Sequence, residues 1–228
     1  MKMFGFRLVP ALAVAAFFSA QAVSSSAFAQ APGASTALVT GDCDYACLIG
    51  FVRGYMDSLA KRDLSGLKVS RDVRFTENDV EMRLGQDGLW GTVTGIAPHG
   101  LEAADVVTGE AAWLGTVNEH GQPAYFAMRM HVANQQIVEV ETVVTRKTGL
   151  PQPFGDASKL VHDPAFTEVL PVEQRRPRER LRAVADSYFN TVELNDGVVF
   201  APFDKECARI ENGIVTTAAG AGSSGDIA

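Results

Sequence analysis

The sequence predicts an α+β fold in which helices pack on one face of a curved antiparallel sheet, followed by a partial second copy of the same unit. An amphipathic helical pattern near the start and a long run of strand-like alternation after it predict the fold class. An internal repeat predicts the partial copy. The chain has 228 residues, which is enough for one well-packed core with some additional chain.

The expected complete unit begins with a helix over residues 44–61. One apolar face recurs at helical spacing and consists of Leu48, Val52, Tyr55, Met56 and Leu59. A strand over 73–75, a turn at Glu77-Asn78-Asp79 and a returning strand Val80–Leu84 follow, and residues 85–100 form a glycine-punctuated stretch. Three longer strands are then expected, over 111–117, 123–132 and 136–145, with tight hairpin turns between them.

The internal repeat relates residues 53–79 to residues 182–213. Helix, connector, strand and Glu-Asn turn recur in the same order, but only a short strand and a Gly/Ala/Ser-rich tail follow the second copy. The unfinished unit fits two hypotheses: strand 210–217 is a free edge that recruits a partner strand, or the chain is a truncated product. The predicted segments are a signal peptide (1–29), a main α+β domain (41–147), a connector (148–177) with five prolines, the partial unit (178–217) and a flexible tail (218–228).

The N-terminus has the features of a secretory signal peptide. Lys2 and Arg7 precede an apolar run over 8–22, and Ala27-Phe28-Ala29 forms a cleavage site. The run is short for a spanning helix, so we expect cleavage near Ala29 and a secreted or periplasmic protein rather than a membrane anchor. After cleavage 18 basic and 27 acidic residues remain, a formal charge of −9. That charge argues against nucleic acid and anionic membranes as partners.

Three cysteines, Cys43, Cys47 and Cys207, belong to a chain expected in a compartment where disulfides form. Four residues apart on an ideal helix, Cβ atoms lie about 5–6 Å from each other, whereas a disulfide needs about 3.8 Å. A Cys43–Cys47 bridge therefore requires a frayed helix start. Cys207 could pair with either of them or with a cysteine outside this chain. A zinc site would need a second ligand pair that the sequence lacks nearby, so we expect no metal.

The order of helices, strand, hairpin and long meander, with Ala60-Lys61-Arg62-Asp63 closing the first helix, resembles the NTF2-like superfamily. The resemblance covers residues 41–147, is strongest to the SnoaL-like and ketosteroid-isomerase-like branch, and extends to uncharacterised secreted tandem-domain members. It implies a cone, in which a bent sheet surrounds an apolar pocket closed by helices, and a possible homodimer through the open sheet face. Members include isomerases, cyclases, lyases and non-catalytic proteins, so the fold does not select a function.

The resemblance also implies roles for two side chains. Ketosteroid isomerases use a tyrosine of the first helix as oxyanion donor, a position that Tyr55 occupies here. They use a carboxylate after the first strand to move the proton, and Glu77 falls at that position. Their third group, a protonated aspartate, is replaced by a methionine within residues 127–131, which argues against steroid isomerase activity itself.

These residue types predict acid–base chemistry without a cofactor. A carboxylate in an apolar interior has a raised pKa and becomes a usable base, while a tyrosine hydroxyl stabilises the developing oxyanion. We therefore predict an isomerase, lyase or cyclase acting on a small, largely apolar carbonyl or hydroxyl compound. The expected substrate-binding residues are Phe75, Asn78, Trp90, Trp113 and Met128. Alternatively Tyr55 is a core residue and Glu77 a solvated turn residue, and the protein is a non-catalytic periplasmic binding or assembly domain.

Overall fold

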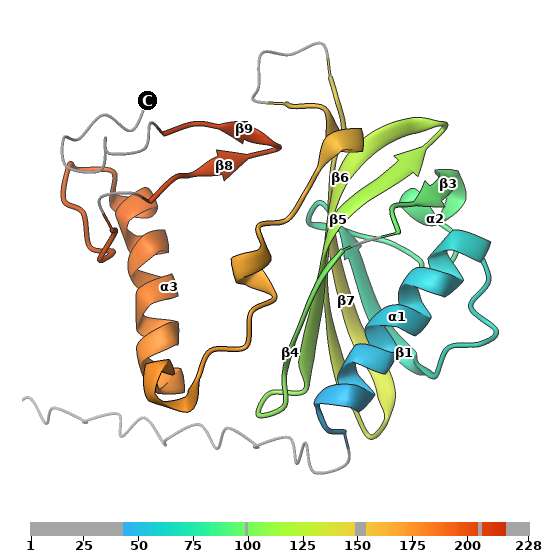
Figure 1. Ribbon diagram of the computed structural model, residues 1–228. Coiled ribbons are helices and arrows are strands. Elements are labelled where there is room, and N and C mark those ends of the chain that lie inside the picture. The colour runs from blue at the N-terminus through green and yellow to red at the C-terminus, as the bar shows by residue number, and fades with distance from the viewer. Residues whose placement is uncertain (1–42, 99, 149–153, 205–206, 218–228) are drawn as a thin grey trace, which may run out of the picture. The chain divides into compact units, whose positions relative to one another are not determined.

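The computed structural model describes residues 43–98, 100–148, 154–204 and 207–217 (Figure 1). The predicted signal peptide and flexible tail lie outside these residues, as does part of the predicted connector. Within the described ranges, the helices are all too short or too polar to cross a membrane.

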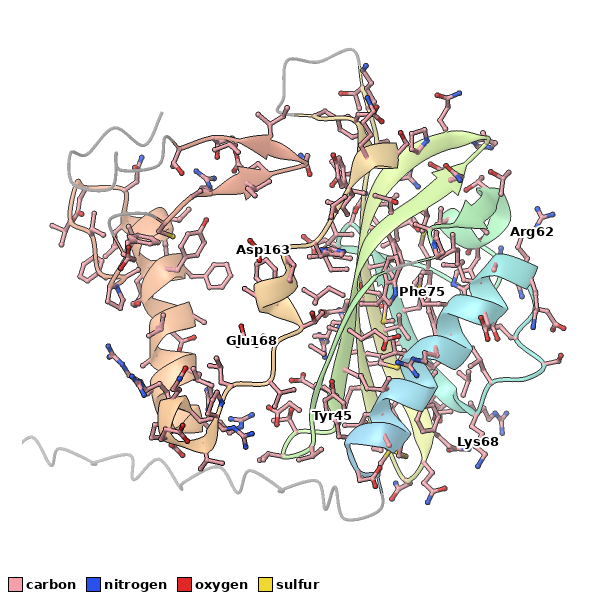
Figure 2. All side chains as sticks on the ribbon, in the orientation of Figure 1. Tyr45, Arg62, Lys68, Phe75, Asp163 and Glu168 are labelled. Carbon is pink, nitrogen blue, oxygen red and sulfur yellow. A yellow bond between two sulfur atoms is a disulfide. The ribbon has the colours of Figure 1, made fainter. Side chains whose placement is uncertain are left out.

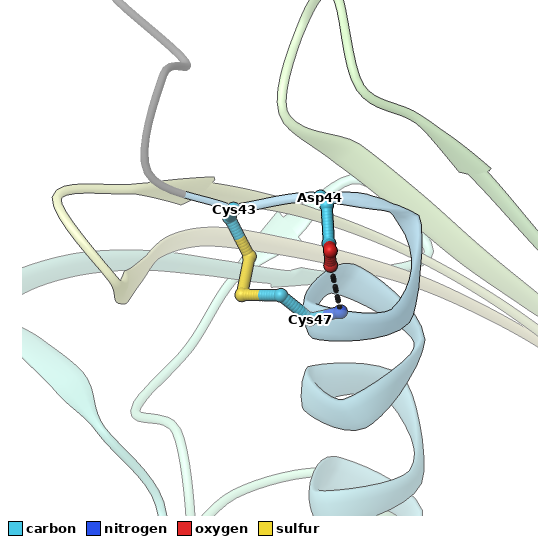
Figure 3. Close-up of a disulfide and its surroundings, with 3 residues drawn as sticks. All are labelled: Cys43, Asp44 and Cys47. Atoms are coloured by element: carbon cyan, nitrogen blue, oxygen red, sulfur yellow. Dashed lines mark hydrogen bonds between the residues drawn. A yellow bond between two sulfur atoms is a disulfide. The ribbon is translucent and has the colours of Figure 1, made fainter.

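Helix α1 spans Tyr45–Lys61, as the apolar periodicity predicts. The carboxylate of Asp44 caps its start by accepting a 2.9 Å hydrogen bond from the backbone N–H of Cys47 (Figure 3). Cys43 precedes this cap, so its backbone leaves the helical path and its Cα lies 5.2 Å from that of Cys47, within disulfide range. The two cysteines are bonded, and the remaining cysteine, Cys207, is free and exposed.

A curved seven-stranded sheet follows α1, and the helix lies across one of its faces (Figure 1). The spatial order is β2-β1-β7-β6-β5-β3, and β4 also pairs with β5. The strands are β1 (Val69–Glu77), β2 (Val80–Glu81), β3 (Val93–Ile96), β4 (Leu101–Asp105), β5 (Glu110–Glu119), β6 (Gln122–Ala133) and β7 (Gln136–Thr145). The predicted α+β class, with a helix packed on a curved sheet, is confirmed.

Two details of the predicted sheet are wrong, and residues 89–96 form elements beyond the prediction. The sheet is mixed rather than antiparallel, because the chain crosses from β2 to the far edge and returns through β5, β6 and β7, which places β7 parallel to β1. The returning strand predicted over Val80–Leu84 is only Val80–Glu81. The glycine-punctuated stretch contains a short helix, α2 (Leu89–Thr92), and strand β3, elements too short to give a periodic signal.

The core lies between α1 and the concave side of the sheet. Along β6 the side chains of Phe126, Met128, Met130 and Val132 are buried, with exposures of 0–3 %. Arg129 lies on the opposite face, where it forms ion pairs with Glu110, Glu139 and Glu141. The strand thus has one apolar face toward the core and one charged face away from it.

After β7 the chain continues through three short 3-10 turns, Ala157–Lys159, Pro164–Phe166 and Val172–Gln174. Helix α3 (Arg178–Leu194) follows, and then a hairpin of β8 (Ile210–Glu211) and β9 (Ile214–Val215). The single strand predicted over 210–217 is thus two strands with a turn at Asn212-Gly213. The proposal that this segment is a partial second copy stays a prediction.

Candidate active site

Glu77 is the last residue of β1 and is buried, with 4 % of its surface exposed. Its Oε2 accepts a 2.8 Å hydrogen bond from the backbone N–H of Leu89, the first residue of α2. Its Oε1 accepts a 2.9 Å hydrogen bond from Nη2 of Arg146. The alternative in which Glu77 is a solvated turn residue is wrong, because both carboxylate oxygens are engaged inside the fold.

Gly88 permits this arrangement. Its φ angle is 61°, in the left-handed region that glycine adopts without steric cost. A Cβ atom at this position would lie 2.5 Å from Oε2 of Glu77, closer than any non-bonded contact allows. Only glycine therefore lets the backbone before α2 approach the carboxylate so closely.

Arg146 joins Glu77 to a second carboxylate, Glu119, at the end of β5. The Nη2 atom of Arg146 donates to Oε1 of Glu119 at 2.9 Å, and its Nε forms an ion pair with Oε2 of the same residue. The hydroxyl of Thr92 in α2 also donates to Oε1 of Glu119, at 2.6 Å. We call these three charged residues the Glu77–Arg146–Glu119 network.

The network changes the acidity of Glu119 and Arg146. Hydrogen bonds from Arg146 hold the pKa of Glu119 below its ordinary value, and the same bonds raise the pKa of Arg146. The side chain of Arg146 is 37 % exposed, against 4 % for Glu77 and 12 % for Glu119. Arg146 is thus the member that solvent reaches most easily, and it covers a carboxylate buried behind it.

Tyr55 lies on α1 with 1 % of its surface exposed. Its hydroxyl oxygen accepts a 3.0 Å hydrogen bond from Nε1 of Trp90, and the two rings meet edge to face at a centroid distance of 5.3 Å. Burial raises the pKa of Tyr55, and the negative charge of Glu77 raises it further. The phenol therefore stays protonated.

Helix α2 connects the two predicted catalytic groups. Its first residue, Leu89, binds the carboxylate of Glu77, and its second, Trp90, binds the hydroxyl of Tyr55. Three segments far apart in the sequence thus place a carboxylate and a phenol in one apolar region.

The other predicted site residues have identifiable places. Phe75, Trp113 and Met128 belong to the core, with exposures of 1 %, 5 % and 2 %, and Phe75 lies between α1 and the sheet (Figure 2). The side chain of Asn78 binds the backbone of Val144. Its Oδ1 accepts a hydrogen bond from the N–H of Val144 at 2.9 Å, and its Nδ2 donates to the carbonyl of the same residue at 3.2 Å. Their contact with a substrate stays a prediction.

Sequence reasoning missed Arg146, Glu119 and the role of Gly88. Glu119 and Arg146 lie 27 positions apart at the ends of two strands separated in the sheet by β6. The signal available was a charged residue of opposite sign at each strand end. It identifies a pair only once the order of strands is known.

Among the described residues, none of the His, Cys, Asp and Glu side chains form a group of three that could hold a metal ion.

Comparison with known proteins gives similarity without an assigned activity. A family model described as a domain of unknown function, DUF8021, matches residues 174–227, which contain α3 and the β8–β9 hairpin. No curated protein matches the chain.

Several solved structures resemble parts of the chain. One, from Kribbella flavida, is provisionally described as a ketosteroid isomerase and is 15 % identical, covering 57 % of this chain and 95 % of its own, with a TM-score of 0.37. An NTF2-like protein of unknown function from Burkholderia xenovorans is 12 % identical, with coverages of 52 % and 95 % and a TM-score of 0.37. Another from Cytophaga hutchinsonii is 8 % identical, with coverages of 42 % and 88 % and a TM-score of 0.33. Similarity at this level does not give the chain a function.

Proposed function

We propose that this protein performs cofactor-free acid–base chemistry, of the isomerase, lyase or cyclase type, on a small apolar carbonyl or hydroxyl compound. The observation that carries the proposal is that adjacent residues of α2 bind two buried groups: Leu89 binds the carboxylate of Glu77 and Trp90 binds the hydroxyl of Tyr55. A base and a hydrogen-bond donor held by one short helix in an apolar region are what proton abstraction beside a carbonyl requires.

In the proposed reaction the Glu77 carboxylate takes a proton from the carbon next to the substrate carbonyl. The Tyr55 hydroxyl donates a hydrogen bond to the oxygen that becomes negative. This hydroxyl already accepts from Trp90, so its own proton remains to be donated, and acceptance strengthens it as a donor. Return of the proton to another carbon gives isomerisation, and loss of a β-substituent gives elimination. No redox partner is required for either outcome.

Arg146 has a positioning role in this proposal. It now occupies Oε1 of Glu77, so the carboxylate can act as a base only when the guanidinium moves aside. Its greater exposure makes it the member of the network able to do so. Glu119 would keep Arg146 close during the reaction through its own ion pair.

The test uses two probes with wild-type protein and matched variants. Isomerisation of a β,γ-unsaturated cyclohexenone is followed by ultraviolet absorbance, and binding of β-naphthol, an enolate mimic, by fluorescence. We expect Glu77→Gln to lower kcat about 10²–10⁴-fold and keep naphthol binding. Tyr55→Phe is expected to lower kcat about 10²–10³-fold and weaken that binding.

The second unit supplies matched controls. Glu211→Gln and Tyr188→Phe make the same chemical changes outside the site and should leave both readouts unchanged. If the wild type neither converts the ketone nor binds naphthol, or if the control variants act like the site variants, the proposed chemistry is wrong.

A non-catalytic binding or assembly domain is the second candidate. It is favoured by the engagement of both Glu77 oxygens within the fold, which gives the carboxylate a structural role. Naphthol binding without any turnover in the wild type would support it. Secretion, and a homodimer through the sheet face, also remain proposals. Sequencing the N-terminus of protein recovered from the periplasm tests the first, because cleavage near Ala29 would leave Gln30 as the first residue.

A further inference from the structure

Helix α3 presents an apolar stripe to solvent. Leu181, Ala185, Phe189 and Val192 recur at helical spacing, and all four are exposed, with values of 59 % for Leu181, 67 % for Phe189 and 48 % for Val192. Single exposed apolar residues are ordinary, but a continuous stripe along a helix marks an interaction surface.

The charge along α3 is strongly asymmetric. Within the helix, residues 178–182 contain three arginines and one glutamate, whereas residues 183–194 contain two acidic residues and no basic one. A helix that is basic at one end and acidic at the other complements a second copy of itself when the two run antiparallel. Parallel pairing would instead place like charges together at both ends.

The shapes along the stripe favour the same arrangement. In an antiparallel pair with its two-fold axis near Ser187, Ala185 of each helix faces Phe189 of the other, so a small side chain leaves space for a large one. Leu181 then faces Val192, and Arg182, which flanks the stripe on the same side as Glu193, lies opposite Glu193 of the other helix. A two-fold axis repeats each of these contacts twice.

We infer that α3 is a homodimerisation surface, in which the stripe of one chain packs antiparallel against the stripe of a second copy. Helices of this type pack with their axes about 8–10 Å apart. Two 17-residue helices bury less than the roughly 1,200–2,000 Å² typical of stable complexes. The dimer is therefore concentration-dependent, with a Kd in the micromolar range or weaker.

Sedimentation velocity over a wide range of concentrations tests this inference, using the chain that begins at Gln30. The wild type should shift from monomer to dimer. Phe189→Glu should raise the Kd at least about tenfold, because it places a charge in the apolar contact. Arg182→Glu alone, and Glu193→Arg alone, should each raise the Kd several-fold. The double change R182E/E193R restores the opposite charges and should return the Kd to near the wild-type value.

Cysteine pairing fixes the direction. In a Cys207→Ser background, a mixture of Leu181→Cys and Val192→Cys chains should form the mixed disulfide dimer, whereas a parallel pair would join Leu181→Cys to itself. Circular dichroism confirms that each variant remains folded. A wild type that stays monomeric, a dimer that ignores the α3 changes, or parallel cross-linking would each overturn the inference. The first of these would mean that the stripe is covered otherwise, and the second would place the interface elsewhere, such as the sheet face.

Discussion

Helices α1 and α3 share their length and the features at their ends, but they differ in whether their apolar faces are buried. Each has 17 residues and ends at a residue with left-handed backbone, Arg62 with φ 54° and Asn195 with φ 41°. Each is followed by a hairpin in which a glutamate ends the first strand and an asparagine with positive φ begins the turn. In α1 the apolar face is buried by the sheet, whereas in α3 it is exposed. Similar local sequence features therefore accompany a helix in both places, whereas the burial of the apolar face of α1 depends on the sheet that packs against it.

The predicted repeat, which stays a prediction, can be aligned in two ways. Alignment of the sequences pairs Tyr55 with Val184, but alignment of the helix bounds pairs it with Tyr188, the eleventh residue of α3. Tyr55 is buried, and Tyr188 is half-buried beside Phe189 and Phe203. In the second alignment Tyr188 and Glu211 take the places of Tyr55 and Glu77, while the arginine that covers Glu77 comes from the end of β7.

The largest expected effect compares the fourth residue of each helix. Leu48 is 0 % exposed and Leu181 is 59 % exposed. Leu48→Ala should lower the free energy of unfolding by about 2–5 kcal/mol, because it leaves a cavity in the core. Leu181→Ala should change it by less than about 0.5 kcal/mol. Urea unfolding at low protein concentration measures both, and equal losses would show that α3 is buried like α1.

The next effect compares two arginine–glutamate pairs. Arg146→Met leaves the buried Glu77 without its cation and should lower the free energy of unfolding by about 2–3 kcal/mol. This loss is below the range for fully buried pairs because Arg146 is partly exposed. Arg209→Met, which removes the partner of Glu211 in the second unit, should cost at most about 1 kcal/mol. Adding Glu77→Gln to Arg146→Met should recover part of the loss. A failure to recover would mean that Arg146 acts through packing rather than charge.

A disulfide belongs to α1 alone. Replacing Cys43 and Cys47 by alanine should lower the free energy of unfolding by about 2 kcal/mol, since the bridge closes a short loop and restrains the unfolded chain. Cys207→Ser, at an exposed free cysteine, should leave stability unchanged. Thermal unfolding of the three proteins measures this, and a large effect of Cys207→Ser would contradict the free state of that thiol.

The smallest effect depends on pH. The folded state raises the pKa of Tyr55 above its ordinary value near 10, so the unfolded chain loses this proton first as pH rises. The stabilising contribution is complete below pH 10 and disappears above it, at up to about 1.4 kcal/mol per pH unit. Tyr55→Phe should flatten the decline of stability between pH 10 and 11, and Tyr188→Phe serves as the control. Identical slopes in the wild type and Tyr55→Phe would contradict the pKa shift.

The sequence predicts the elements with a regular apolar pattern well. It predicts short elements and contacts between distant strands poorly. Strand β7 begins and ends where alternation predicts it, and α1 differs from its prediction by one residue at its start. Helix α2 has four residues and includes a glycine, so no periodic pattern could reveal it. The parallel contact of β1 with β7 depends on how the chain crosses the sheet, which local patterns do not record.

The candidate site divides in the same way. Tyr55 and Glu77 could be named because each occupies a recognisable place on a helix or at a strand end. Arg146 and Glu119 could not, because their roles arise only when strands separated by β6 bring their ends to one region. Burial of Glu77 likewise depends on α2 folding over it, and nothing local to residues 77–79 signals that helix.

The attachment of Glu77 and Tyr55 to adjacent residues of α2 has a mechanical consequence. One peptide unit separates the amide that holds the carboxylate from the indole that holds the phenol. A displacement of this single turn therefore loosens both groups at once, and neither can shift far while the other stays in place. The effects of substituting Glu77 and Tyr55 on stability should for that reason be non-additive, because both side chains depend on the position of α2.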